Sequence, residues 1–268
     1  MDLGLTGKTA LVSGAHRGTG SVIAQQLARE GAVVAVHGPD RGDSDDVVRE
    51  IEKSGHSAIA VHGDLTTNEG ADLAIHAVSK ESAPPLVLVN NWGGVAPGRW
   101  ENADADTWHA DYERNVLSMV RLSSRAASYM KETGAGRIIN LGTLGTVQPA
   151  ARTPHYYAAK SALAAASASL ARELGPYGIT VNLVSPGLIK TAEVEAHFRA
   201  RAERKGWGSN WGEIETRAME EMRGDNPSGR MSTREEVAAA VVFLAGEPAS
   251  HISGINLRVD GGASGLSL

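Results

Sequence analysis

Short runs of β-branched and aliphatic residues alternate with longer helix-like segments along almost the whole chain, and this alternation limits the folds it can adopt. The runs are apolar at successive positions, which is typical of strands whose two faces are both covered. Parallel strands of this kind are joined by crossover connections, usually helices. The pattern therefore predicts an α/β protein with a parallel sheet between two layers of helices.

Seven strands are predicted, and helices are predicted between them. The strands are residues 9–12, 33–36, 58–62, 86–90, 137–141, 180–184 and 255–259. The helices are residues 21–30, 43–53, 71–79, 106–131, 155–174 and 234–244. No linker rich in proline, glycine or serine divides the chain. We therefore expect residues 1–268 to form a single doubly wound domain of the Rossmann type, with right-handed crossovers.

One segment, residues 191–232, interrupts this rhythm because it is far longer than a usual connection. It is predicted to contain two short helices, at residues 192–204 and 214–223, around the joint Gly-Trp-Gly-Ser-Asn-Trp-Gly. Such insertions often close over binding sites, so the segment is interpreted as a helical lid over the substrate. Two alternatives stay open for Trp207 and Trp211: they line the substrate site, or they form a hydrophobic clasp that holds the lid together.

Composition argues against several classes of protein. The net charge is −5 and no long stripe of lysine and arginine is present, which argues against a nucleic-acid partner. The absence of cysteine excludes disulfides, thiolate metal ligands and a cysteine nucleophile. The histidines show no metal-ligand spacing, so no metal is expected. No apolar stretch approaches the ~20 residues of a membrane span and no signal-peptide pattern is visible, so a cytoplasmic location is expected.

A glycine-rich turn directly follows the first predicted strand and opens the first helix. Gly14, Gly18 and Gly20 permit a tight turn that brings backbone N–H groups near a pyrophosphate at a helix N-terminus. A plain turn is the alternative, but the strand before it and the helix after it favour a dinucleotide site. The spacing is Gly-x-x-x-Gly-x-Gly rather than the more common Gly-x-Gly-x-x-Gly.

This spacing resembles that of the short-chain dehydrogenase/reductase superfamily, including its 3-oxoacyl-carrier-protein reductases, and further family motifs follow in order. They are Gly-Asp-Leu-Thr with Asp64, Asn90-Asn91-Trp92-Gly93, Arg-Asn-Val with Asn115, Tyr156-x-x-x-Lys160, Pro186-Gly187-x-x-x-Thr191 and Arg-Val-Asp-Gly-Gly at 258–262. The resemblance covers nearly the whole chain. It implies that the cofactor is bound by Gly14, Arg17, Gly18, Gly20, Asp64, Asn91, Gly93, Tyr156, Lys160, Pro186, Gly187 and Thr191.

The resemblance also implies a catalytic set. Carbonyl reduction needs a proton donor at the oxygen that becomes negative when hydride reaches the carbon. Tyr156 is interpreted as this donor, and Lys160, one helical turn further on, as the cation that lowers the pKa of the tyrosine. Thr143 stands where the family usually has serine, so its hydroxyl is expected to bind the substrate oxygen. Asn115 is expected to hold a water that links Lys160 to solvent, and Tyr157 to point into packing.

The preferred cofactor is predicted from the end of the second strand. NAD sites place an acidic residue there to bind the ribose 2′-hydroxyl, whereas this chain has Gly38. Arg17 stands where NADP-binding relatives carry a cation for the 2′-phosphate, and Arg41 is near enough in sequence to assist. Asp40 favours NAD, and solvated arginines are the alternative. NADP is predicted, with NAD as the second choice.

The predicted function is hydride transfer between NADP(H) and a small ketone or secondary alcohol. A non-catalytic NAD(P) sensor is one alternative, although such proteins usually lack the tyrosine or the lysine. An enoyl reductase is another, although those resemble Tyr-x-x-x-x-x-x-Lys. A homotetramer is expected, because the family commonly assembles through the long helices after the fourth and fifth strands and the small residues at 162–169 suit close helix contact. Trp92, where the family usually has alanine, either narrows the pocket or packs in the core.

Overall fold

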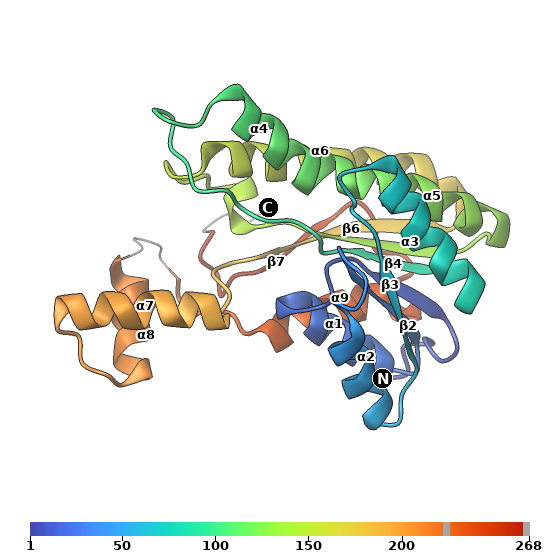
Figure 1. The fold of residues 1–268 in the computed structure, drawn as a ribbon, viewed down its shortest axis with the longest axis horizontal. Helices are drawn as coiled ribbons and strands as arrows, with labels where there is room; N and C mark the ends of the chain where they lie inside the picture. Colours follow the sequence, from blue (N-terminus) through green and yellow to red (C-terminus); the bar gives the residue numbers. More distant parts are fainter. Residues whose placement is uncertain (222–225, 265–268) are drawn as a thin grey trace.

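The seven predicted strands lie in one sheet in the computed structural model, which describes residues 1–221 and 226–264 (Figure 1). The strands are β1 (Thr9–Val12), β2 (Val33–Gly38), β3 (Ala58–His62), β4 (Val87–Asn90), β5 (Gly136–Leu141), β6 (Ile179–Pro186) and β7 (Asn256–Val259). Their order is β3-β2-β1-β4-β5-β6-β7, and every neighbouring pair is parallel. The order reverses at β1 and β4, so the connections after these two strands leave toward opposite edges of the sheet.

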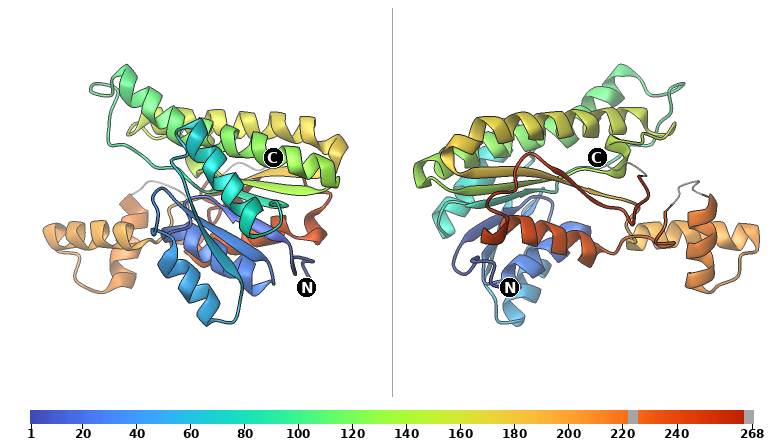
Figure 2. Two further views of the ribbon diagram at one scale, coloured as in Figure 1. Left: turned by 45° about the vertical axis from the view of Figure 1, so that its right-hand side comes forward. Right: turned by 180° about the vertical axis from the view of Figure 1, so that it is seen from behind.

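Two layers of helices cover the sheet (Figures 1 and 2). One layer contains α1 (Gly18–Arg29), α2 (Asp45–Lys53) and α9 (Arg234–Ala245), and the other contains α3 (Asn68–Glu81), α5 (Ser118–Thr133) and α6 (Pro154–Leu174). Successive residues of a strand point to opposite faces. In β1, Ala10 and Val12 therefore pack with the first layer and Leu11 with the second. Both faces of the sheet are buried, which confirms the predicted fold class.

The connection after β4 differs from the prediction. The single helix expected over residues 106–131 is divided into α4 (Ala105–Tyr112), a π-helical turn (Glu113–Leu117) and α5. Single π-turns inside helices are often found at functional sites. This one carries Asn115, so the predicted continuous helix is wrong at the turn that presents a predicted site residue.

Other boundaries differ by less. α1 begins at Gly18 rather than at residue 21, so Gly18 and Gly20 belong to the helix itself. β2 continues to Gly38, and β6 continues to Pro186. None of the helices in the described part of the chain is long and apolar enough to cross a bilayer.

The insertion after β6 forms a two-helix unit, which we call the arm (residues 191–232, as far as they are described). Its helices are α7 (Ala192–Lys205) and α8 (Trp211–Glu221), and the predicted end of the second, residue 223, lies outside the described residues. The arm projects from one side of the sheet (Figures 1 and 2). Its helices pack on each other around a small core of Phe198, Ala202, Trp207, Ile214, Ala218 and Met231.

The two stems of the arm are tied together. Ile189 and Ser232 form a parallel β-bridge. The Lys190 N–H donates to the Ser232 oxygen at 2.8 Å, and the Ser232 N–H donates to the Leu188 oxygen at 2.9 Å. The Ser232 hydroxyl also donates to the backbone oxygen of Val259 in β7 at 2.9 Å. The chain therefore leaves the sheet and returns to it at one place.

Candidate functional site

A cleft of about 460 Å³ lies at the carboxyl ends of β1 and β4, where the strand order reverses. Ligands of open α/β sheets bind at this position. The glycine-rich turn, the residue after β2 and the loop after β4 form its walls. The lining residues are Gly14, His16, Arg17, Gly18, Thr19, Pro39, Asn91, Trp92, Gly93, Gly94, Val95 and Arg114.

The glycine-rich turn is held in a shape that leaves little room for side chains. Gly14 and Gly18 have φ angles of +62° and +63°, in the left-handed region that favours glycine. A Cβ on Gly20 would lie 2.5 Å from both the Gly14 oxygen and the Asn91 Nδ2 atom. That nitrogen donates to the backbone oxygens of Ser13 and Gly14, each at 3.0 Å. The N-terminus of α1 thus faces the cleft, which suits a phosphate group.

A buried histidine that the sequence analysis did not single out fixes this turn. The Nδ1 atom of His37 accepts from the Gly14 N–H at 3.1 Å, and its Nε2 donates to the Gly63 oxygen at 2.9 Å. Burial lowers the pKa of His37 to about 4, so the ring is neutral near pH 7. His37 thereby connects the turn after β1 with the loop after β3.

The residues predicted to choose between NAD and NADP lie around the rim of the cleft. A Cβ on Gly38 would lie 2.7 Å from the Cβ of Asp43, so an acidic side chain does not fit there without movement of the backbone. Arg17 lines the cleft, and its side chain is 76% exposed. Asp40 and Arg41 are both exposed. The rim therefore offers a cation, Arg17, and has no room at Gly38 for the carboxylate that binds the ribose 2′-hydroxyl in NAD sites.

Tyr156 and Thr143 meet at the carboxyl end of β5. Tyr156 lies in the first turn of α6, and Thr143 caps a short 3-10 turn (Leu144–Thr146) directly after β5. Burial raises the pKa of Tyr156 to about 12, against the smaller opposing effect of a side-chain hydrogen bond with Thr143. Tyr156 is thus a protonated phenol beside a second hydroxyl.

Lys160 lies one helical turn beyond Tyr156 and is buried. Its Nζ donates to the Leu141 oxygen at 2.8 Å and lies 5.9 Å from the centroid of the Tyr156 ring. Burial lowers the pKa of Lys160 to about 8. The net shift of the Tyr156 pKa is upward because burial of the phenol dominates, whereas the prediction expected Lys160 to lower it. The Lys160 ammonium donates to a backbone carbonyl.

The π-turn brings Asn115 to the same place. Its Nδ2 donates to the Gly94 oxygen at 2.8 Å, and its Oδ1 accepts from the Gly94 N–H at 3.2 Å. A Cβ on Gly93 would lie 2.7 Å from the Asn115 Oδ1 and 3.4 Å from the Lys160 Nζ. Because Gly93 has no side chain, the Asn115 amide and the Lys160 ammonium both lie close to its backbone, which lines the cleft.

The other residues predicted to bind the cofactor lie outside the lining of the cleft. Asp64 is exposed, and its Oδ1 accepts from the Thr66 N–H at 2.9 Å. Pro186 ends β6, and Gly187 follows it. Thr191 caps α7 by accepting a backbone N–H from the first turn of that helix.

A second pocket, of about 280 Å³, connects Thr143 with the arm. The prediction that Tyr157 points into packing is incomplete, because its ring lines this pocket as well as packing against Gly145. The lining residues are Thr143, Leu144, Gly145, Gln148, Ala150, Tyr157, Gly187, Leu188, Met219, Asn226, Ser232, Asp260 and Ala263. Its wall mixes polar groups with aliphatic ones, and Met219 belongs to α8.

Trp207 and Trp211 both pack on the core of the arm, and neither lines the pocket that contains Thr143. Trp92 does both things at once: it lines the cleft, and its ring packs edge-on against His37 with centroids 6.0 Å apart. Trp207 is buried in the core of the arm, as the clasp alternative requires. Trp211 lies at the start of α8, with the Lys190 Nζ 4.7 Å from the centroid of its ring.

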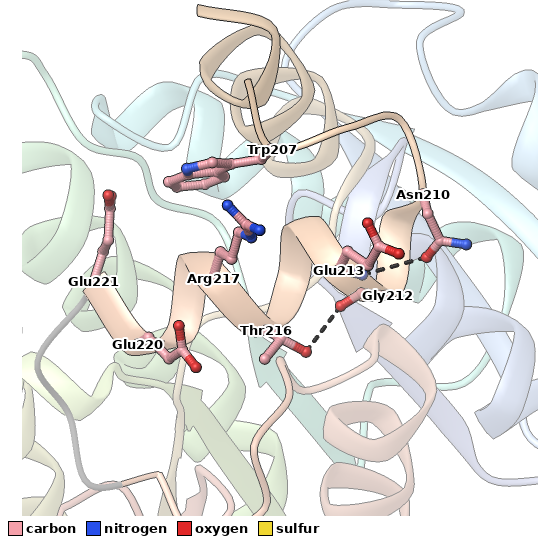
Figure 3. Close-up of a pocket in the computed structure, with 8 residues that line it drawn as sticks. All are labelled: Trp207, Asn210, Gly212, Glu213, Thr216, Arg217, Glu220 and Glu221. Atoms are coloured by element: carbon pink, nitrogen blue, oxygen red, sulfur yellow. Dashed lines mark hydrogen bonds between the residues drawn. The ribbon is translucent and has the colours of Figure 1, made fainter. Parts of the chain in front are cut away.

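The arm has a hollow of its own, of about 730 Å³, beside Trp207 and α8 (Figure 3). Arg217 points toward the Trp207 ring, and three carboxylates surround the hollow (Figure 3). The lining residues are Trp207, Asn210, Gly212, Glu213, Thr216, Arg217, Glu220 and Glu221. None of the four predicted catalytic residues, all of which the structure describes, contributes to this lining.

Comparison with known proteins identifies a family for the chain. A family model described as enoyl-(acyl carrier protein) reductase matches residues 14–264. The chain is 31% identical to the 3-oxoacyl-[acyl-carrier-protein] reductase FabG of Pseudomonas aeruginosa, over 97% of this chain and 98% of that protein. It is 34% identical to the uncharacterized oxidoreductase YvaG of Bacillus subtilis, over 98% of each chain.

A solved structure is similar over the full length. The L-sorbose reductase of Gluconobacter frateurii, complexed with NADPH and L-sorbose, has a TM-score of 0.92 and 30% sequence identity, with 100% of both chains covered. The fold, the glycine-rich turn and these relatives point to one conclusion. The chain belongs to the short-chain dehydrogenase/reductase superfamily of oxidoreductases.

Proposed function

We propose that this protein reduces a ketone, or oxidises the corresponding secondary alcohol, with NADP(H) through Tyr156, Lys160, Thr143 and Asn115. The observation that carries the proposal is the convergence of these side chains: Tyr156 lies beside Thr143, and Lys160 and Asn115 both approach Gly93. Two similar proteins, an L-sorbose reductase and a 3-oxoacyl reductase, act on carbonyl compounds.

The cleft fits a dinucleotide. The left-handed glycines and the N-terminus of α1 suit the pyrophosphate, and the exposed Arg17 and the crowded Gly38 favour a 2′-phosphate over a free 2′-hydroxyl. When bound, NADPH supplies the hydride that reduces the carbonyl carbon. By resemblance, the remaining residues assigned to the cofactor are Gly20, Asp64, Asn91, Gly93, Pro186, Gly187 and Thr191.

Tyr156 acts as the proton donor. Its high pKa keeps the phenol protonated, and the hydroxyl of Thr143 beside it binds the same substrate oxygen. As negative charge develops on that oxygen, the phenol proton moves to it and leaves a tyrosinate. The Lys160 ammonium, within cation–π range of the ring, stabilises the tyrosinate. Asn115 holds the water through which the proton is replaced, a role taken from the family resemblance.

The pocket that connects Thr143 with the arm belongs to the same proposal. Residues 1–268 act as one catalytic domain, with 191–232 as the lid. Because Met219 of α8 lines the pocket that contains Thr143, movement of the arm changes the volume available to the substrate. The mixed lining of this pocket suits a small, partly polar ketone.

A homotetramer is proposed as the assembly. Ser161, Ala165, Ala168 and Ser169 leave a face of α6 exposed and free of large side chains, and Val120 of α5 is also exposed. Such a face suits close contact between helices of two copies. Light scattering is expected to give a tetramer mass, and Ala165→Arg is expected to reduce it. A monomer mass at micromolar concentration contradicts this part of the proposal.

The test is NADPH oxidation by the purified protein against a panel that contains L-sorbose, a 3-oxoacyl thioester, simple ketones and an enoyl thioester. We expect turnover of at least one carbonyl compound. Tyr156→Phe should lower kcat by on the order of 10²–10⁴-fold with unchanged NADPH affinity. Tyr157→Phe is the matched control and should retain most of the activity.

Two other outcomes would replace the proposal. Reduction of the enoyl thioester alone would support the activity named in the description of the family model, against the Tyr-x-x-x-Lys spacing. Tight NADPH binding with no turnover on any member of the panel would support a sensor.

A further inference from the structure

A buried pair of titratable side chains lies directly behind the proposed catalytic residues and has no part in the mechanism above. Asp111, near the end of α4, and His155, in the first turn of α6, both have side chains without exposed area. The His155 Nδ1 and the Asp111 Oδ2 are 2.6 Å apart. The pair thus joins α4 to α6 at the residue before Tyr156.

The surroundings of the pair indicate the direction of its hydrogen bond. An ionised carboxylate only accepts hydrogen bonds, so the Nδ1 of His155 donates. The Nε2 is buried without a hydrogen-bond partner among the described residues, and a Cβ on Gly98 would lie 2.6 Å from it. An imidazolium would bury a second, unpaired N–H there, which is strongly unfavourable. The hydrogen bond between the two side chains therefore runs from the His155 Nδ1–H to the Asp111 carboxylate.

The charged groups around this carboxylate face the proposed site. The Arg114 NH1 lies 3.8 Å from the Asp111 Oδ1, but the Arg114 side chain is 40% exposed and solvent weakens its effect. Burial lowers the pKa of Lys160, and the charge on Asp111 opposes that change. Burial, Tyr157 and the charge on Asp111 all raise the pKa of Tyr156.

The backbone around the pair is equally constrained. The Asn115 Nδ2 donates to the Asp111 backbone oxygen at 3.0 Å. Thr153, which precedes α6, has a φ of 53°, in the left-handed region that threonine rarely adopts. Its N–H donates to the Gly98 oxygen at 2.9 Å, and Gly98 is also the residue that gives His155 its space. Such strain persists where the surroundings fix it, and it is found preferentially at functional sites.

We propose that Asp111 and His155 are a positioning pair, in which His155 fixes the Asp111 carboxylate. This carboxylate keeps the Lys160 ammonium charged. It also keeps the start of α6 aligned with Asn115. The consequence for catalysis rests on the proposed function, but the effect on Lys160 does not.

The direct test is an NMR titration of the labelled lysine side chains, in which Lys160 is assigned with a Lys160→Met variant. Asp111→Asn keeps the shape and can still hydrogen-bond His155, but it removes the charge. We expect the Lys160 midpoint to move to lower pH by on the order of half a unit to one unit. Asp106→Asn, an exposed carboxylate on the same helix, is the control and should leave the midpoint unchanged.

His155 is tested separately. His155→Asn keeps a donor to the carboxylate and should shift the Lys160 midpoint less than Asp111→Asn does. Nitrogen NMR of labelled histidine should show the proton of His155 on Nδ1 in the unmodified protein. A proton on Nε2, or a Lys160 midpoint that Asp111→Asn leaves in place, would overturn the proposal. If Asp111→Asn fails to fold, a proton on Nε2 in the histidine spectrum still overturns the proposal.

The pH profile of kcat/KM supplies the catalytic readout. Removal of the Asp111 charge lowers the pKa of both Lys160 and Tyr156, so the profile of Asp111→Asn is expected at lower pH than that of the unmodified protein. A fall in kcat without any shift of the profile would indicate a merely structural role and count against the proposal. If no carbonyl compound is turned over, the proposed function fails, whereas the lysine titration still decides whether the pair acts on Lys160.

Discussion

The sheet domain and the arm are built in different ways. In the sheet domain each helix buries one face against strands that are themselves covered on both sides, so a side chain such as Leu88 has no exposed area. In the arm, α7 and α8 bury only the faces that they turn toward each other. The proposed chemistry lies entirely in the first region. The proposed lid function therefore belongs to the second region.

The largest effect should come from deleting a side chain in the core of the sheet domain. Leu88→Ala removes a fully buried side chain of the central strand β4 and should lower the free energy of unfolding by about 2–5 kcal/mol. Ile214→Ala is the matched deletion in the arm. It should change the global transition by less than about 1 kcal/mol, because the arm can open on its own.

Chemical denaturation measures the global transition of both variants, and hydrogen exchange measures opening of the arm. We expect Ile214→Ala to lose protection in α7 and α8 only. Equal losses of global stability in the two variants would show that the arm unfolds together with the sheet, and the comparison would then be wrong.

Acid should also act on the two regions unequally. The folded-state pKa of His37 lies at about 4, below its ordinary value of 6.5, so between these values the unfolded chain binds a proton that the folded chain does not. Stability is therefore lost as pH falls from 6.5 toward 4, by on the order of 3 kcal/mol. In the arm, His197 is exposed.

Denaturation at several pH values tests this difference. The His37→Gln variant should be less stable at pH 7, but its stability should change less between pH 4 and 6.5. In the unmodified protein, the amides of the turn around Gly14 should be the first to lose protection from hydrogen exchange as the pH falls. The His197→Gln variant serves as the control. A slope that His37→Gln leaves unchanged would assign the acid sensitivity to another group.

Arg17, which lies where the two regions meet, is tested for its effect on the choice of cofactor. Its NH1 lies 3.8 Å from the Glu193 Oε1 of α7, and both side chains are largely exposed. Arg17→Ala should weaken NADPH binding by about 1–3 kcal/mol and leave NADH binding nearly unchanged. Arg29→Ala, an exposed arginine at the other end of α1, is the control. Calorimetric titration decides, and tighter binding of NADH than NADPH by the unmodified protein would reverse the choice of cofactor.

The smallest effect should come from Trp211, which is half-buried against the core of the arm. Trp211→Ala should raise the substrate KM by a few-fold, about 1 kcal/mol, with unchanged NADPH affinity. Trp207→Ala removes a core side chain of the arm and should instead increase hydrogen exchange throughout α7 and α8. If the arm is fully protected without cofactor and neither variant changes KM or kcat, the arm is a fixed clasp rather than a lid.

Regular features of the fold follow from the sequence, and several details of the site do not. The alternation of apolar runs and helices predicts all seven strands, because burial on both faces leaves a direct pattern in the residues. The π-turn at Asn115 was not predicted, because a single wide turn within a helix is marked by no short motif. The spacing of Tyr156 and Lys160 is local and was predicted, whereas Thr143 was identified through the family resemblance. The direction of the Lys160 ammonium toward Leu141 depends on tertiary packing and was not.

The same limit applies to the histidines. His37 and His155 are separated from their partners by long stretches of chain, so no short motif marks them. Metal-ligand spacing is a pattern that a sequence can reveal, whereas a neutral buried ring that joins two backbone segments has no such pattern. A histidine that follows four valine and alanine residues inside a strand, as in β2, is the one local signal that could have directed attention to His37.

The paired stems at Lys190 and Ser232 have a consequence for how members of this superfamily diversify. Because the two ends of the arm are already joined, lengthening or replacing what lies between them adds little loop-closure entropy and leaves the sheet untouched. Substrate range can then change by exchange of this segment while the proton donor and the nucleotide cleft are inherited intact. A chimaera that carries the segment of another reductase between these two residues should fold, and it should take on the donor's preference for substrate size.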